Sequence, residues 1–351
     1  DEEPNWLIWL ARLCMGWAAF LLFTLQPMAG QYLLPSYGGG PGVWTACLLF
    51  FQVWVLLGYA AAQGLALLDE RLQLGIWVVL LISALIALPV VPRIGFIDSP
   101  PTLSVLISLS LGVGLPVLVL AMASPLVQSW MSRFTNAPYG LFAWSNAGSL
   151  LALSLFPFVL EPLAPRIALV QAWGWGLGAF AVLTVILAIK ARNHPVAFRE
   201  KSQSNWRAGW VLWPAVAVAM LMIVSRNLGQ EITPGPFTWV APLVVYLSTF
   251  ITSFGWPKWY SRVVVAFLLP VAWTAVFWLA LPGGEWSLAL HLAAQLFVLF
   301  VVGWTCHAEL YRLRPELEGL TFFYTSLAAG GVVGGLAVTV IAPLVFDRYW
   351  E

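Results

Sequence analysis

Eleven long apolar segments, separated by short connections, constrain this chain more than any other feature of its sequence. Each is close to the roughly 20 residues that a helix needs to cross a bilayer. The segments are continuously apolar, which favours membrane helices over the alternating strands of a membrane barrel. We therefore predict an all-α, polytopic integral membrane protein. The approximate bounds are 6–28, 42–66, 74–92, 102–123, 139–161, 166–190, 208–228, 237–255, 263–281, 285–306 and 320–346.

The composition excludes a water-soluble protein. Of the 351 residues, 61% are hydrophobic and 9% are charged, whereas about 25% are charged in an ordinary soluble domain. The net charge of +1 gives no basic surface for nucleic acid. Cys14, Cys47 and Cys306 are odd in number and form no Cys-x-x-Cys pair, so no disulfide framework or zinc site is expected. Bound lipid is the expected non-protein partner, and an apolar cofactor at a partner interface stays open.

The basic residues predict the orientation. Eleven Lys and Arg residues lie in the connections that follow the second, fourth, sixth, eighth and tenth apolar segments. The other connections and their borders carry three. By the positive-inside rule, the basic connections and the N-terminus lie on the cytoplasmic side of a bacterial inner membrane. The basic linker 192–207 then separates a six-helix repeat, 1–191, from a second repeat of five helices, 208–351.

The two halves carry similar motifs about 180–195 residues apart. A helix that follows Tyr139 ends in Glu161-Pro-Leu163, and one that follows Leu320 ends in Ala342-Pro-Leu344. Pro41-x-x-Trp44 and Pro236-x-x-Trp239 open matching helices. Parallel repeats of this kind are typical of major-facilitator (MFS) transporters, so an MFS-like fold lacking a twelfth helix is expected.

An ordered set of motifs resembles the membrane part of bacterial fused transporter–spermidine synthase proteins. The motifs include Leu25-Gln-Pro-Met-Ala-Gly30, Gly38–Trp44, Ser145–Leu153, Phe158–Pro162 and Cys306–Leu310. The resemblance implies a transporter-like membrane domain. The synthase activity is not carried over, because the chain shows no strand–Gly-rich turn–helix for a nucleoside cofactor.

Two departures from that family concern the end of the first segment. Gln26 stands where the family has a glutamate, and Gln31 where it has a lysine. Gln26-Pro27 also predicts a helix break that exposes backbone carbonyls. The alternative is an ordinary helix end followed by an interfacial stretch, 31–40.

Five polar residues in or at the ends of the apolar segments are candidate solute-binding residues, because polar groups in a bilayer are costly. They are Gln26, Gln52, Asn146, Arg226 and Glu231. For Gln52 and Asn146 a packing role is favoured. For Arg226 and Glu231 a snorkelling surface pair is the alternative.

Small residues and tryptophans predict packing rather than chemistry. Gly148, Gly330, Gly331, Gly334 and Gly335 are expected to let helices approach closely. Many of the 21 tryptophans lie near predicted helix ends and fit interfacial belts. Others, such as Trp17, Trp54, Trp77 and Trp273, lie away from these ends and are expected to face lipid, with a partner subunit or a bound apolar cofactor as alternatives.

A further polar cluster follows His307 in the sequence. Glu309, Arg312, Arg314 and Glu316 are expected to form a solvated, paired loop. His307 and Glu309 are two residues apart and face different sides of a helix, so they do not make a metal site.

The leading functional hypothesis is a transporter that moves a small solute, such as a polyamine, by alternating access. One alternative is a non-catalytic scaffold or accessory subunit of a larger membrane complex. Another is the membrane anchor half of a longer, spermidine-synthase-like enzyme. No catalytic residues are assigned, because the sequence shows no nucleophile–base pair, metal cluster or nucleotide loop.

Overall fold

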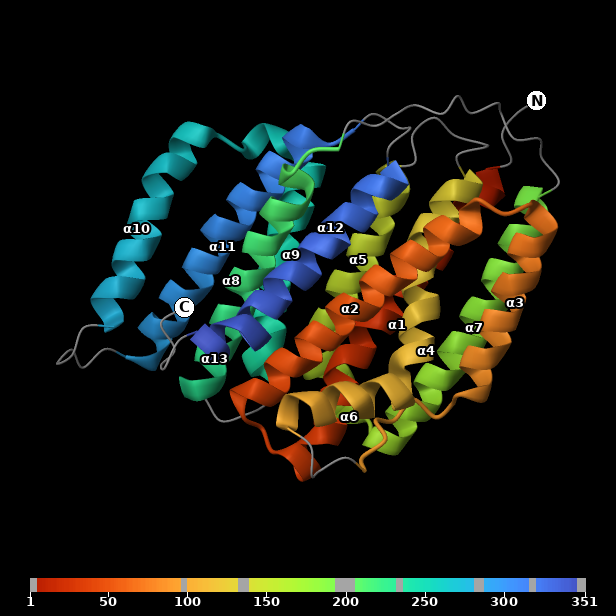
Figure 1. Cartoon of the computed structure of the whole chain (residues 1–351), viewed down its shortest axis with the longest axis horizontal. Helices are drawn as coiled ribbons and strands as arrows, with labels where there is room; N and C mark the ends of the chain where they lie inside the picture. The colour runs from red at the N-terminus through yellow and green to blue at the C-terminus, as the bar shows by residue number, and fades with distance from the viewer. Residues whose placement is uncertain are drawn as a thin grey trace. The chain divides into compact units, whose positions relative to one another are not determined.

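The computed structural model describes residues 5–95, 100–131, 139–192, 206–231, 236–280, 287–315 and 320–345, and all regular structure in these ranges is helical (Figure 1). Eight helices are long and apolar enough to cross a membrane, and 240–255 and 262–278 are shorter apolar helices. The all-α, polytopic prediction is therefore confirmed. The long helices are α1 (Asn5–Tyr37), α2 (Pro41–Ala66), α3 (Glu70–Ile86), α4 (Pro101–Met131), α5 (Tyr139–Leu155), α7 (Arg166–Arg192), α8 (Gly209–Glu231), α9 (Pro236–Gly255), α10 (Arg262–Ala280), α11 (Leu288–Leu313) and α12 (Leu320–Leu336).

The chain forms two compact units. Unit 1 contains Asp1–Tyr37, Phe50–Asn205 and Pro315–Thr325. Unit 2 contains Gly38–Leu49, Trp206–Arg314 and Ser326–Glu351. These units are defined by compact packing, whereas the repeats 1–191 and 208–351 are defined by similar sequence motifs. The repeat boundaries therefore stay a prediction.

In unit 1, α1 packs against α4, α5 and α7. Two indoles tie α1 to α7. Trp173 Nε1 donates to the Leu21 carbonyl at 2.8 Å, and Trp17 Nε1 donates to the Gly176 carbonyl at 2.9 Å. On the α5 side, a Cβ added to Gly148 would overlap the carbonyl oxygen of Gly16. Only glycine permits so close a crossing of the two backbones.

The helix break expected at Pro27 is wrong, and so is a helix end before Gln31. Helix α1 continues through Pro27 and Pro35 to Tyr37. Its side chains around the first proline are buried, with Leu25 and Met28 at most 2% exposed. Packing against neighbouring helices maintains a membrane helix in which a proline has removed one backbone donor.

Unit 2 repeats the packing of unit 1. Helix α8 packs against α9 and α11. A Cβ added to Gly330 or Gly334 of α12 would overlap the carbonyl oxygen of Val211 or Ala215 on α8. The later helix thus crosses the first helix of its unit at a glycine, as α5 crosses α1.

A π-helical turn follows the crossing helix in both halves of the chain. After α5 comes η1 (Phe156–Leu160) and the short α6 (Glu161–Leu163). After α12 comes η4 (Ala337–Ile341) and the short α13 (Ala342–Val345). The sequence motifs Glu-Pro-Leu and Ala-Pro-Leu therefore occupy equivalent places.

The expectation that four central tryptophans face lipid is wrong for three of them. Trp77 is fully buried, with its ring centroid 6.2 Å from that of Trp130. Trp54 Nε1 donates to Ser110 Oγ at 3.3 Å, and Trp17 is bonded as described above. Only Trp273 of the four is exposed, at 49%. For Trp17 and Trp54, packed helices supply the acceptor that an indole N–H lacks among lipid tails. Trp77 is held by packing instead, because its Nε1 has no hydrogen-bond partner among the described residues.

Candidate functional site

A polar pair joins α1 to the turn after α5 in unit 1. Gln31 Nε2 donates to Glu161 Oε1 at 2.6 Å. Gln31 is 4% exposed, and Glu161 follows the π-turn η1 directly. Arg166, at the start of α7, interacts electrostatically with the same carboxylate. Glu161 is half-buried, and the charge-assisted bond from Gln31 engages its carboxylate within unit 1.

Gln26 presents a different situation on the same helix. It is half-buried, and its Oε1 is buried with no hydrogen-bond partner among the described residues. Five residues separate it from Gln31, so the two amides point to different sides of α1. A buried acceptor without a partner costs about 1–3 kcal/mol and calls for an explanation.

The end of α8 holds the polar side chains of unit 2. Arg226 is 8% exposed and Ser225 is 3% exposed. Ser225 Oγ has no hydrogen-bond partner in the described part of the chain. Glu231 is the last residue of α8, but its side chain lies outside what the structure describes, so its pairing with Arg226 stays a prediction. The burial of Arg226 argues against a snorkelling surface role.

Gln52 and Asn146 are half-buried on α2 and α5. No hydrogen bond among the described residues joins either to another candidate.

The glycines that the sequence predicts to be packing residues lie at helix contacts. Gly148, Gly330 and Gly334 meet backbone as described above, and Gly335 lies beside Leu49 and Met222. Gly331 is buried.

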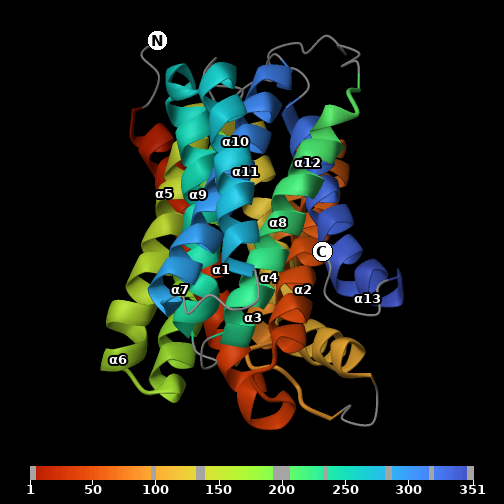
Figure 2. The same ribbon diagram turned by 90° about the vertical axis from the view of Figure 1, so that its left-hand side faces the viewer.

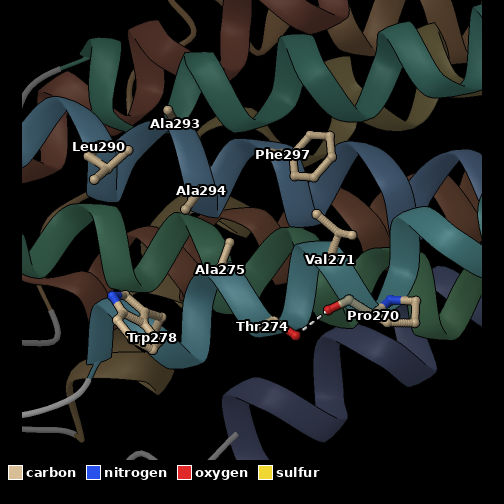
Figure 3. Close-up of a pocket in the computed structure, with 9 residues that line it drawn as sticks. All are labelled: Pro270, Val271, Thr274, Ala275, Trp278, Leu290, Ala293, Ala294 and Phe297. Atoms are coloured by element: carbon tan, nitrogen blue, oxygen red, sulfur yellow. Dashed lines mark hydrogen bonds between the residues drawn. The ribbon is translucent and has the colours of Figure 1, made fainter.

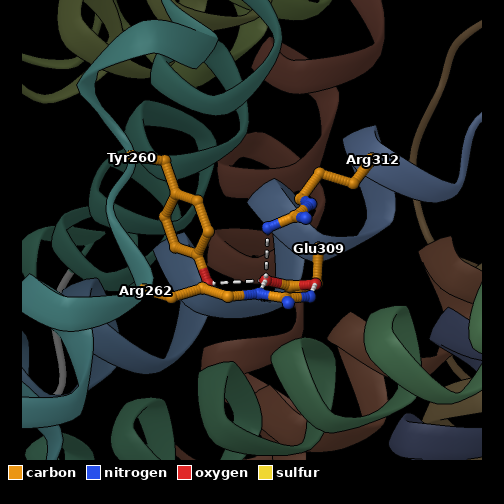
Figure 4. A network of polar contacts seen from close by, with 4 residues as sticks. All are labelled: Tyr260, Arg262, Glu309 and Arg312. Atoms are coloured by element: carbon orange, nitrogen blue, oxygen red, sulfur yellow. Dashed lines mark hydrogen bonds and ion pairs between the residues drawn. The ribbon is translucent and has the colours of Figure 1, made fainter.

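A second polar network centres on Glu309 of α11 (Figure 4). The sequence predicts its pairing with charges nearby in the chain, but not its bonds to Tyr260 and Arg262. Its Oε1 accepts from Tyr260 Oη at 2.9 Å and from Arg262 Nε at 2.7 Å. Its Oε2 accepts from Arg262 Nη2 at 2.5 Å, which makes the guanidinium contact bidentate. Arg312 Nη1 lies 3.8 Å from Oε1. The network ties the connection between α9 and α10 to α11.

The solvated loop expected here is therefore wrong for Glu309. Helix α11 continues to Leu313, and Glu309 is 9% exposed. Arg312 and Arg314 are near the surface, as expected, and Glu316 lies outside the described residues. The main partners of Glu309 lie on α10 and in the connection before it, not in the segment that follows it in sequence.

Tyr260 lies between α9 and α10, and its environment predicts an alkaline transition. Burial, and next the hydrogen bond to the Glu309 carboxylate, raise the pKa of its phenol to about 12. An unfolded tyrosine has a pKa of about 10. The stabilisation is complete below about pH 10 and is lost as the pH rises towards 12. We expect Tyr260→Phe to remove this part of the alkaline loss in thermal unfolding curves recorded between pH 8 and 12. An unchanged pH profile would contradict the assignment.

His307 is a buried polar group with a defined tautomer. Thr249 Oγ1 donates to the Tyr246 carbonyl at 2.7 Å, so it accepts from His307 Nδ1 at 3.0 Å. Nδ1 therefore carries the proton, as inferred from the hydrogen-bond network. Nε2 is buried and has no partner among the described residues. The Tyr246 and Phe250 rings pack edge-on against the imidazole, each with its centroid 4.9 Å away, which fixes the orientation of the ring.

No protein-family model and no curated protein matches this chain. Among solved structures it is similar to a D-xylose–proton symporter, at 14% identity over 98% of this chain and 91% of that one, with a TM-score of 0.55. It is also similar to the inward-open xylose transporter XylE from E. coli, at 13% identity over 98% and 90%, with the same TM-score. At this identity the likeness shows the fold, which is that of an MFS-like membrane protein. Both similar proteins are transporters rather than enzymes, and no comparison supports the finer resemblance to the spermidine synthase fusions.

Proposed function

We propose that this protein is a membrane carrier that moves a small, uncharged polar solute by alternating access of its two repeats. Its MFS-like fold supports this, as does the likeness to two proteins described as xylose transporters. The distribution of lysine and arginine supports an orientation with the N-terminus in the cytoplasm of a bacterial cell.

The observation that carries the proposal is the buried, partnerless amide oxygen of Gln26. It lies on α1, where the resembling family has a charged glutamate. A neutral acceptor suits a solute that brings a hydroxyl or amide donor, and such a donor removes the cost of the empty acceptor.

A polyamine fits the structure less well. A polycation requires carboxylates that are open to it. Of the two candidates, Glu161 is engaged by Gln31 and by the charge of Arg166, and the side chain of Glu231 lies outside the described residues. We therefore favour hydroxylated neutral solutes over polyamines.

The direct test is uptake into proteoliposomes. We expect saturable uptake of at least one member of a panel of pentoses, hexoses and polyols, and none of spermidine. Gln26→Ala should raise the KM about tenfold, because one hydrogen bond contributes about 1.5 kcal/mol. Gln171→Ala is the matched control, since Gln171 is an exposed glutamine on α7.

Two results would contradict the proposal. Saturable spermidine uptake that survives Gln26→Ala would restore the polyamine hypothesis. Absence of uptake for every solute would favour the other candidate function, an accessory subunit of a membrane complex, for which the exposed apolar surface of α10 gives independent support.

A further inference from the structure

Two exposed features of the described helices differ in what they offer a ligand. Helices α10 and α11 of unit 2 enclose an open apolar groove of about 660 Å³ (Figure 3). Thr274 Oγ1 donates to the Pro270 carbonyl at 2.7 Å, so the hydroxyl in the groove is satisfied within its own helix. The groove offers apolar surface, which does not select a ligand by its charge. A charged side chain near the start of α1 in unit 1 does.

Arg12 is the one charged residue in the apolar stretch from Trp6 to Tyr37, which is long enough to span a bilayer. At a rise of 1.5 Å per residue, it lies about 9 Å further along α1 than Trp6. Tryptophans prefer the interface between membrane and water, so on a spanning helix the arginine lies deeper than this tryptophan. A charge at such a position is costly unless it finds a partner or reaches back to the interface.

The guanidinium of Arg12 has an aromatic partner but no anionic one in the described part of the chain. Its Cζ lies 4.6 Å from the centroid of the Trp9 ring, one turn closer to the start of the helix. Arg12 makes no hydrogen bond or ion pair with the described residues, and its Nε is buried without a partner. A cation–π contact attracts the positive charge but does not neutralise it.

A second indole extends this contact from α1 to α5. Trp144 of α5 packs edge-on against Trp9, with ring centroids 5.7 Å apart. Both indoles are exposed. Helices α1 and α5 pack against each other, and Figure 2 shows the start of α1 beside α5. Trp9, Arg12 and Trp144 therefore form an exposed cluster, with one positive charge among indoles, at the end of unit 1 where α1 begins.

We propose that the cluster of Trp9, Arg12 and Trp144 binds the headgroup of an anionic phospholipid from the leaflet in which α1 begins. A guanidinium and a phosphodiester match in charge and form strong, charge-assisted hydrogen bonds. The indoles suit the same ligand, because tryptophan favours the level of the headgroups. A zwitterionic headgroup fits less well, since its own ammonium already accompanies the phosphate.

The test is native mass spectrometry of the purified full chain in detergent, titrated with dioleoylphosphatidylglycerol or with dioleoylphosphatidylcholine. The two lipids share their acyl chains and differ in headgroup charge. We expect the first phosphatidylglycerol to bind with a Kd about fivefold below that of phosphatidylcholine, as for the attraction of one basic residue to an anionic membrane. Arg12→Gln should abolish this preference. Arg207→Gln is the matched control and should retain it, because Arg207 is an exposed arginine shortly before α8.

Two further measurements make the result specific. Trp9→Leu should also weaken the binding of phosphatidylglycerol, because it removes the ring that holds the guanidinium, whereas Trp9→Phe should retain most of it. Thermal unfolding without added lipid checks that the variants fold. Phosphatidylglycerol should then raise the Tm of the wild-type chain more than that of Arg12→Gln, because a ligand stabilises the folded state that binds it.

Two results would overturn the proposal. One is equal affinity of the wild-type chain for the two lipids, and the other is a preference that survives Arg12→Gln in a variant that folds. Either is expected if the acidic residues 1–3, which lie outside the described residues, neutralise Arg12. The readout involves no transported solute, so its failure is separate from failure of the carrier proposal.

Discussion

Replacing Gly148 by alanine is expected to lower the free energy of unfolding by about 3 kcal/mol, at the upper end of typical overpacking costs. The added methyl would overlap the carbonyl oxygen of Gly16. That oxygen belongs to the backbone of another helix, so no side chain can rotate away to make room. The measurement is thermal unfolding of the purified protein in one detergent, with all variants compared under the same conditions.

The matched control is the same substitution at Gly178 on α7. A Cβ there meets nothing within 4 Å. Alanine is also the better helix former by up to about 1 kcal/mol, so Gly178→Ala should leave stability unchanged or raise it. Gly334→Ala should behave like Gly148→Ala, because its methyl would overlap the Ala215 carbonyl. Equal stability of the Gly148 and Gly178 variants would refute the close crossing of α1 and α5.

The fold could be predicted from the sequence as far as membrane physics dictates it. Apolar segments of spanning length, interrupted by short polar connections, allow little except helices. The bounds of α1 could not be predicted in this way. The proline at position 27 predicts a helix end there, because proline removes a backbone donor. The helix nevertheless continues to Tyr37, where packing against α4, α5 and α7 stabilises it. Tertiary packing therefore overrides the proline.

The polar sites were predictable only in part, since their partners are distant in sequence. Gln31 stands out in the sequence as a departure from a family pattern, but its partner Glu161 lies 130 residues away and directly follows a π-helical turn. Glu309 has an Arg three residues on, which suggested a surface pair. Its strong partner, Arg262, lies 47 residues earlier on another helix. The sequence signal for the π-helical turns is the motif that follows each of them, Glu161-Pro-Leu163 in the first half and Ala342-Pro-Leu344 in the second.

Replacing Glu309 by alanine is expected to lower the free energy of unfolding by about 2–3 kcal/mol. The carboxylate is 11% exposed and accepts from both Tyr260 and Arg262. Hydrogen bonds to a charged group contribute about 1.5–3 kcal/mol each. The Arg262 side chain is 63% exposed, so solvent screening keeps the loss below that of a fully buried pair. Thermal unfolding of the two proteins measures the difference.

Arg312→Ala is the matched control, because Arg312 approaches the same carboxylate at 3.8 Å from an exposed position. Its removal should cost less than about 1 kcal/mol, as for other surface ion pairs. Arg262→Lys should fall between the two, since an ammonium cannot make the bidentate contact of a guanidinium. A double-mutant cycle of Glu309→Ala with Arg262→Ala should return a coupling that is clearly different from zero. Coupling near zero, or an Arg312 variant as unstable as the Glu309 variant, would show that the bidentate bond does not hold the α9–α10 connection to α11.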